Sequence, residues 1–229
     1  MRIGIVIALA AEARTLARRD GEFFVHGDAP CHYQTLVSGP GPQRAGVAAR
    51  QLLAAGCDAL LSFGLAGGLA PALRPGALVV ASTVHIASGA SLHCDRSLHD
   101  ALISSLMVSG ARSASMYGAD LPIVSHADKR TLHEALGVAA VDMESAAVGR
   151  AAGEAARPFA VLRCVVDPAH FTLPRAALAG MAADGGSRPL ATAAAVLMHP
   201  FELPDLIRLA LWYGGALRTL RGAGALLCG

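Results

Sequence analysis

The sequence of 229 residues is poor in charge, in aromatic side chains and above all in lysine. Charged residues make up 16% of the chain and aromatic residues 4%, and arginine outnumbers lysine 18 to 1. The net charge of +2 and the lack of a basic cluster with interleaved aromatic residues argue against a nucleic-acid partner. A hydrophobic content of 54% argues against disorder. The chain is therefore predicted to fold around a sizeable core.

Cysteine is scarce, and long apolar runs are missing. The five cysteines are odd in number and fit no zinc-binding pattern, so we expect reduced thiols in a cytoplasmic protein without a metal site. No stretch of about 18 apolar residues is free of charged or glycine breaks, which predicts no transmembrane helix.

The apolar segment 3–11 could pass for a signal-peptide core. Because charged residues follow at helical spacing, a buried strand that leads into a helix is the better interpretation.

Hydrophobic runs and glycine breaks predict strands that alternate with helices. The expected strands cover residues 3–9, 33–37, 59–63, 77–83, 138–141 and 159–166. The expected helices cover residues 11–19, 42–55, 98–107 and 143–154, and a helical extension is expected over about 188–221. This order predicts a single α/β domain over residues 1–229, a three-layer α/β/α arrangement around a central mixed, largely parallel twisted sheet.

Polar groups gather just past the ends of these predicted strands. The positions are Glu12, Ser38-Gly39, Gly64–Gly68, Asp142, Glu144 and Asp167. Ligands of open α/β sheets bind outside the carboxyl ends of the strands, so we expect these groups to line one cleft. Each also has a plain structural reading, since an acid complements the start of a helix and Asp before Pro forms turns. Arg163, inside an apolar strand, needs a partner if it is buried, and Glu144 is a natural candidate.

Five segments of the chain resemble the purine nucleoside phosphorylases and, more closely, the methylthioadenosine and adenosylhomocysteine nucleosidases. The segments are Ile3-Gly4-Ile5-Val6 through Glu12, Ser38-Gly39-Pro40-Gly41, Gly64-Leu65-Ala66-Gly67-Gly68-Leu69-Ala70-Pro71, Val141-Asp142-Met143-Glu144-Ser145-Ala146-Ala147, and Val161-Leu162-Arg163 through Asp167. They keep the family's order and spacing over residues 1 to about 168. The resemblance implies an enzyme that cleaves the N-glycosidic bond of a purine nucleoside, a homo-oligomer, and no cofactor, with inorganic phosphate as a candidate co-substrate.

Two later stretches resemble a narrower branch, the hopanoid-associated phosphorylases. They are residues 166–178 and 200–220, the second with its Glu202-Leu203-Pro204 entry. This resemblance implies that adenine is released from a 5′-modified adenosine, adenosylhopane, during hopanoid side-chain synthesis. Two alternatives stay open: an ordinary methylthioadenosine or adenosylhomocysteine nucleosidase, and a nucleoside-binding protein of the same fold without turnover.

The resemblance also assigns roles to single residues. Asp167 matches the general acid that hydrogen-bonds purine N7, and Glu12 matches the glutamate that positions an attacking water. Glu144 matches the carboxylate that grips the ribose hydroxyls, Met143 packs against the sugar, and Arg163 orients Glu144. The remaining residues expected in the substrate pocket are Gly64, Leu65, Ala66, Gly67 and Asp142.

The nucleophile and the 5′ group remain open at this point. Water would use Glu12, whereas phosphate would need backbone N–H groups such as those of Gly39 and Gly41 and a cation such as Arg44 or Arg14. The family usually carries Ser or Thr where this chain has Leu65. Loss of that hydroxyl puts the usual substrate geometry in doubt, and the leucine could instead extend an apolar wall beside a large hydrocarbon group.

The C-terminal tail has the periodicity of an amphipathic helix. Apolar residues recur at 203, 206, 207, 210, 211, 214, 217 and 220, and arginines lie off that stripe. Such a helix packs on its own domain or on a second subunit, or it lies in a membrane interface and gives access to a lipid substrate. The sequence leaves these alternatives open.

Overall fold

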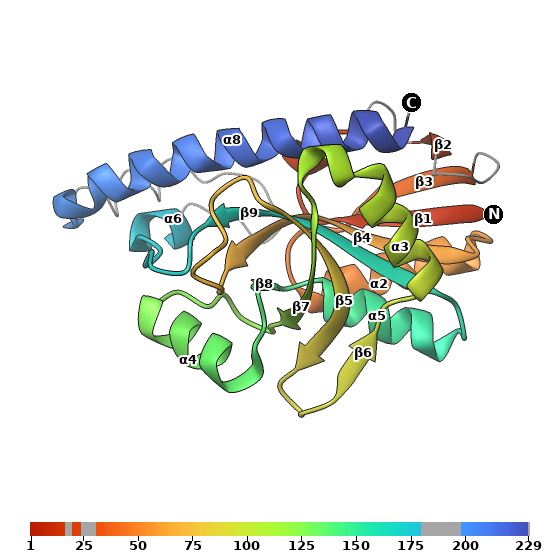
Figure 1. Cartoon of the computed structure of the whole chain (residues 1–229), viewed down its shortest axis with the longest axis horizontal. Helices are drawn as coiled ribbons and strands as arrows, with labels where there is room; N and C mark the ends of the chain where they lie inside the picture. The colour runs from red at the N-terminus through yellow and green to blue at the C-terminus, as the bar shows by residue number, and fades with distance from the viewer. Residues whose placement is uncertain (17–19, 24–30, 180–197, 229) are drawn as a thin grey trace.

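One mixed sheet runs through the centre of the molecule (Figure 1). The structure is a computed structural model, and it describes residues 1–16, 20–23, 31–179 and 198–228. The strands of this part of the chain are β1 (Arg2–Ile7), β2 (Asp20–Phe23), β3 (Cys31–Val37), β4 (Ala59–Gly68), β5 (Leu78–Ile86), β6 (Ser91–His93), β7 (Arg112–Gly118), β8 (Ala140–Asp142) and β9 (Phe159–Asp167).

The strand order is β2-β3-β1-β4-β8-β7-β5-β6, and β9 pairs with both β4 and β5. The strands β4, β8, β7, β5 and β9 therefore close into a ring beside the open part of the sheet. Parallel pairing joins β1 to β3 and β4, β4 to β9, and β7 to β5 and β8. The pairs β2–β3, β4–β8, β5–β6 and β5–β9 are antiparallel. The predicted α/β fold with a mixed sheet is confirmed.

Helices cover both faces of this sheet. They are α1 (Ala10–Ala13), α2 (Pro42–Ala54), α3 (Arg96–Ser105), α4 (His126–Leu136), α5 (Ser145–Glu154), α6 (Arg175–Ala179) and α8 (Leu203–Cys228), with short 3₁₀ turns at Met107–Ser109 and Pro200–Glu202. In Figure 1, α8 spans one side of the sheet, and α2 and α5 lie together on the other. The strands between the layers are buried on both faces, which explains why every residue of β9 is buried.

The glycine-rich run after the third predicted strand is not a loop. Gly64–Gly68 continues β4, where it pairs with β9 and, at Gly67 and Gly68, with β8. The expected loop was wrong because glycine also occurs in strands where another group approaches the backbone closely. β4 thereby continues beyond its pairing with β1, which ends at Phe63, into the region of the acidic residues.

Other expected boundaries also need correction. The helix predicted over 11–19 is a four-residue helix, α1, which ends at Ala13, and residues 17–19 lie outside the described residues. The segment between the strand predicted over 77–83 and the helix predicted over 98–107 contains β6. The segment 108–137, for which no element was predicted, forms β7 and α4. Residues 188–197 of the expected tail helix also lie outside the described residues.

The C-terminal helix α8 buries only part of the apolar stripe that its sequence contains. Ala216, Leu220, Ala223 and Leu227 are fully buried against the sheet, together with the partly buried Leu209 and Tyr213. The stripe residues at 203, 207 and 211 are 44%, 54% and 70% exposed. The amino-terminal part of α8 extends beyond the sheet (Figure 1), so that its apolar side chains meet no core there.

Candidate active site

Glu12, Glu144 and Asp167 line one cavity of about 260 Å³. They come from α1, from the start of α5 and from the end of β9, three elements far apart in the sequence. Asp142, Met143, Leu65, Ala66 and Gly67 also line this cavity, as the sequence predicted for the substrate pocket. The geometry therefore brings the candidate acids together around a space large enough to admit part of a nucleoside.

Glu12 is held in place by two backbone N–H groups. Its Oε2 accepts a hydrogen bond from Leu9 N at 2.8 Å, and its Oε1 accepts one from Leu65 N at 2.9 Å. The first contact stabilises the start of α1, which is the plain structural role considered for this glutamate from the sequence. The second contact connects α1 to β4. Burial raises the pKa of Glu12 to about 7, partly against the opposing charge of Arg163. At neutral pH this carboxyl group can therefore both take up and release a proton.

Arg163 lies fully buried beneath the cavity and faces three carboxylates. Its Nε lies 2.6 Å from Asp142 Oδ2, and its Nη2 lies 3.5 Å from Glu144 Oε2. Nη2 also donates to Ser62 Oγ at 2.7 Å. Burial alone would lower the pKa of Arg163, but Asp142, Glu144 and Glu12 together raise it above its ordinary value. The closest partner is thus Asp142, and the Glu144 partner expected from the sequence is the second.

Glu144 joins the starts of two helices. It is the residue before the first turn of α5, and its Oε1 accepts a hydrogen bond at 3.0 Å from Gly41 N, at the start of α2. Burial raises the pKa of Glu144, while Arg163 acts in the opposite direction. Asp142 is anchored in turn, because Ser145 Oγ donates to its Oδ1 at 2.5 Å. This network fixes Glu144 at the wall of the cavity before any ligand binds.

Gly64 has no room for a side chain. A methyl group at this position would lie 2.6 Å from Arg163 Nη1 and 2.8 Å from Glu12 Oε1. Among the described residues, Arg163 Nη1 has no hydrogen-bond partner, and it packs against this glycine. The absence of a side chain at Gly64 therefore leaves the space in which the arginine and the glutamate approach each other.

Asp167 is paired with a residue that sequence reasoning missed. Lys129, on α4, is completely buried, and its Nζ donates to Asp167 Oδ2 and, at 2.8 Å, to the carbonyl oxygen of Phe171. Burial raises the pKa of Asp167, and the Lys129 ammonium opposes that effect. The sequence offers only a weak indication of a role for Lys129. It is the single lysine of the chain, but it lies in a segment for which no helix or strand was predicted.

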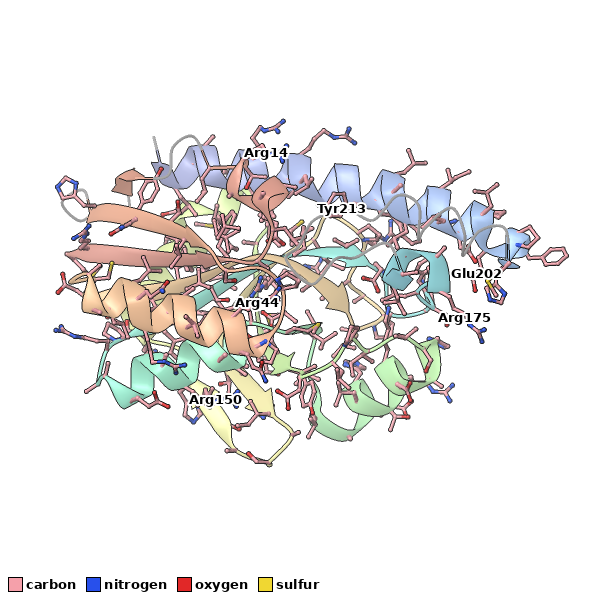
Figure 2. All side chains as sticks on the ribbon, turned by 180° about the vertical axis from the view of Figure 1, so that it is seen from behind. Arg14, Arg44, Arg150, Arg175, Glu202 and Tyr213 are labelled. Carbon is pink, nitrogen blue, oxygen red and sulfur yellow. The ribbon has the colours of Figure 1, made fainter. Side chains whose placement is uncertain are left out.

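A large part of the cavity wall is apolar. This apolar wall is formed by residues of β4, of the 121–123 segment, of α6 and its approach, and of α8, namely Leu65, Leu121, Ile123, Leu173, Ala177, Leu178, Leu209 and Tyr213. Figure 2 shows Tyr213 on the side of α8 that faces the sheet. Leu121 is 74% exposed and marks where this apolar wall reaches the surface. The cavity therefore combines carboxylates with an extended hydrocarbon surface.

Of the residues predicted to hold phosphate, Gly41 contacts an acid, whereas Gly39 and Arg44 do not line the acidic cavity. The N–H group of Gly41 is already bonded to Glu144, and Gly39 does not line the cavity. Arg44 lies in a neighbouring groove of about 780 Å³, which it shares with Arg50 and with Arg150 of α5 (Figure 2). Figure 2 also shows Arg14 on the outside of the molecule beside α8. Among the described residues that line the acidic cavity, none is arginine or lysine.

Two further features concern residues 1–16, 20–23, 31–179 and 198–228, which the structure describes. In this part of the chain, no group of three or more His, Cys, Asp or Glu side chains is arranged to hold a metal ion. No helix within the same residues has both the length and the apolar character needed to cross a membrane.

The sequence matches one protein family over most of its length. Residues 2–197 match the model of the phosphorylase superfamily. The chain belongs to this superfamily, and it is an enzyme of the nucleoside phosphorylase and nucleosidase class. A search of curated proteins found no match.

Solved structures with the same fold include several nucleosidases. A variant of the 5′-methylthioadenosine/S-adenosylhomocysteine nucleosidase of Helicobacter pylori, with 5′-methylthioadenosine in its active site, has a TM-score of 0.67 at 16% identity, over 97% of each chain. The S-adenosylhomocysteine nucleosidase of Streptococcus pyogenes has a TM-score of 0.64 at 20% identity, over 93% of this chain and 96% of that one. The futalosine hydrolase of Helicobacter pylori has a TM-score of 0.62 at 20% identity, over 73% of this chain and 88% of that one. At these identities the likeness concerns the fold.

Proposed function

We propose that the protein cleaves the N-glycosidic bond of an adenosine that carries a large apolar group at its 5′ position, and that it releases adenine. The observation that carries this proposal is the convergence of Glu12, Glu144 and Asp167 on one cavity. Nucleosidases that act on 5′-modified adenosines share the fold, as the solved structures above indicate.

Each acid has a role that suits its position. As the bond between N9 and C1′ breaks, negative charge develops on the purine and positive charge on the ribose. Asp167, whose pKa is raised by burial, donates a proton to N7, which typically contributes ~10²–10⁴ in rate. Glu144 accepts hydrogen bonds from the ribose hydroxyls, and these bonds strengthen as the sugar becomes cationic. Met143, beside Glu144 in the cavity wall, packs against the sugar.

Water is the nucleophile that the cavity favours over phosphate. The wall around the acids is negative, and the described lining residues supply no cation to offset a phosphate dianion. Glu12, with a pKa of about 7, is suited to take the proton of an attacking water. Hydrolysis would then yield adenine and a free ribose derivative.

The apolar wall defines the substrate's 5′ side. Leu65, in place of the residue with a hydroxyl group usual in the family, lines the cavity together with Leu209 and Tyr213 of α8. A polar 5′ group would lose its hydration there without gaining hydrogen bonds, whereas a hydrocarbon group would gain about 25 cal/mol for each Å² buried. Adenosylhopane, the substrate implied by the resemblance to the hopanoid-associated phosphorylases, fits this requirement.

The decisive experiment measures free adenine from adenosylhopane, methylthioadenosine and adenosylhomocysteine, each with and without phosphate. We expect adenine from adenosylhopane at the highest kcat/KM, no dependence on phosphate, and a ribosyl product whose mass carries oxygen from labelled water. The Asp167→Asn variant should lose ~10²-fold or more in kcat. A ribosyl phosphate product would overturn the choice of water. Preference for methylthioadenosine or adenosylhomocysteine would support the ordinary nucleosidase, and tight binding without adenine release would support a binding protein.

A Leu65→Ser variant tests the apolar wall separately. We expect it to lose selectivity for the apolar substrate relative to methylthioadenosine, because it shortens the wall and adds a hydroxyl group. Leu136→Ser, at a 43% exposed position at the end of α4, is the matched control. Unchanged selectivity in Leu65→Ser would contradict the assignment of the 5′ side.

We further propose that the exposed apolar residues at the start of α8 lie against a membrane that holds the substrate. Phe201, Ile207 and Leu211 are 95%, 54% and 70% exposed, next to the exposed Arg208. Flotation with anionic vesicles should recover the wild type, but not a variant with all three residues changed to serine. Leu226→Ser, at an exposed position near the other end of α8, should float like the wild type. Association into a homo-oligomer, as the resemblance implies, would instead bury this surface. In that case the molecular mass in solution should increase with protein concentration for the wild type but not for the triple variant.

A further inference from the structure

Lys129 is the most deeply buried charged group that the proposed reaction leaves without a role. Its side chain has no exposed surface, although the chain offers many exposed positions for a cation. Its Nζ has three acceptors: Asp167 Oδ2, Phe171 O at 2.8 Å and Pro168 O at 3.4 Å. Three acceptors match the three N–H donors of an ammonium group, so this site suits the charged form of lysine.

The contact between Lys129 and Asp167 makes the two carboxylate oxygens different. Oδ2 accepts from Lys129 Nζ. Both oxygens lie close to Gly67 of the cavity wall, 3.5 Å (Oδ1) and 3.6 Å (Oδ2) from the position of an added methyl group, so the contact with Lys129 is what distinguishes them. A proton on the carboxyl group is therefore excluded from Oδ2, which faces the ammonium, and falls on Oδ1.

We propose that Lys129 is a positioning residue for the general acid: it holds Oδ2 of Asp167, directs the transferable proton to Oδ1, and stabilises the carboxylate that remains after transfer. This inference rests on the proposed function. In the step concerned, the O–H bond at Oδ1 breaks, an N–H bond forms at purine N7, and the electron pair stays on Asp167. The resulting negative charge then faces the positive charge of Lys129.

Lys129 offsets an unfavourable effect of burial on the acidity of Asp167. A carboxyl group removed from water keeps its proton at neutral pH but releases it reluctantly, because the charged form is disfavoured. A neighbouring cation favours that charged form and makes the acid stronger. Burial raises the pKa of Asp167 and Lys129 opposes that effect, so Lys129 makes the buried acid a stronger proton donor when N7 becomes basic.

The surroundings of Asp167 leave Lys129 as the cation in direct contact. Glu12, Asp142 and Glu144 line the same cavity as acids, from α1, β8 and the start of α5. His126, on the first turn of α4, makes its hydrogen bond at 3.0 Å to the carbonyl oxygen of Ala169. The pH dependence of Asp167 should therefore respond to Lys129 far more than to other basic groups of α4.

The test compares Lys129→Met with Arg130→Met, which removes the adjacent and exposed cation of the same helix. Base release from the preferred nucleoside is measured as a function of pH. We expect Lys129→Met to lower kcat by ~10-fold to ~100-fold with little change in KM, and to move the alkaline limb of the profile to higher pH. Arg130→Met should leave both unchanged. A loss of activity without any shift of the alkaline limb would show a merely structural role and overturn the proposal.

A second measurement does not depend on turnover. The carboxyl band of Asp167 is identified by difference infrared spectroscopy as the band that Asp167→Asn removes, and its titration is followed in the unliganded protein. The midpoint should rise in Lys129→Met and stay at the wild-type value in Arg130→Met. Should Lys129→Met fail to fold, Lys129→Gln keeps a hydrogen-bond donor without the charge on a slightly shorter side chain, and the same rise is expected. An unchanged midpoint in a folded variant contradicts the proposal, whereas a shifted midpoint in a protein that releases no base contradicts only the proposed function.

Discussion

Arg163 of β9 and Glu144 at the start of α5 face each other beneath the cavity, with Nη2 3.5 Å from Oε2. The guanidinium is closer still to Asp142, and it also approaches Glu12 in the space that a side chain at Gly64 would fill. A single buried arginine thus holds together three acids from three elements. It makes the position of Glu144 depend on the whole network and not on α5 alone.

Replacing Arg163 should be among the most damaging single changes. Arg163→Met leaves three buried carboxylates without their cation, which we expect to cost about 3–5 kcal/mol in the free energy of unfolding. Urea-induced unfolding measures this loss. The control is Arg157→Met just before β9, where the arginine is half-exposed and pairs with Asp58 at 3.8 Å, so that a change under about 1 kcal/mol is expected. Equal effects of the two substitutions would contradict the network.

Glu12 should make both activity and stability depend on pH. Because the folded protein raises its pKa from 4.5 to about 7, base release should increase as the pH rises through about 7, where Glu12 becomes the base. Stability runs the other way: the contribution of Glu12 is complete below about pH 4.5 and is lost as the pH rises to about 7, by about 3 kcal/mol.

Glu12→Gln provides the measurement for this expectation. The pH profile of activity should lose its acidic limb in this variant. The altered hydrogen bonds lower its free energy of unfolding by an amount that does not depend on pH. Its stability relative to the wild type should improve between about pH 5 and about pH 8, because only the wild type then acquires a buried charge. A stability difference that stays flat over this range would rule out the raised pKa.

The close approach at Gly64 predicts that even one methyl group is harmful there. Gly64→Ala places Cβ 2.6 Å from Arg163 Nη1 and 2.8 Å from Glu12 Oε1, and the three acids leave the arginine little freedom to move. We expect a loss of ~10-fold or more in kcat, since small displacements of positioned groups are costly. Gly153→Ala in α5, where nothing lies within 4 Å, should instead stabilise the protein by about 1 kcal/mol. Normal activity in Gly64→Ala would show that the site tolerates rearrangement.

The packing of α8 predicts a contrast between two leucines of the same helix. Leu220 is fully buried in the core, and Leu226 is 43% exposed. Leu220→Ala should therefore cost about 2–5 kcal/mol through the lost contacts and the cavity left behind, whereas Leu226→Ala should cost less than about 1 kcal/mol. Thermal or urea unfolding distinguishes the two, and similar losses would mean that α8 packs differently.

The predicted convergence of the acids depended on recognising strand ends, and it succeeded for two different reasons. Asp167 ends β9, which runs parallel to β4, so the rule for parallel sheets applies to it. Asp142 ends β8, which is antiparallel to β4. It reaches the site only because β4 continues through its glycines and pairs with β8 at Gly67. The periodicity of the sequence contains no information on that extension.

By itself, the sequence determined the alternation of strands and helices, the burial of β9 and the identity of the candidate acids, because apolar runs and local residue types are written along the chain. The tertiary structure decided which charges meet. It paired Arg163 with Asp142 more closely than with Glu144, placed Lys129 against Asp167, and turned the predicted stripe of α8 outward at its start. These outcomes depend on how segments far apart in sequence share space and exclude water, and no local pattern specifies that.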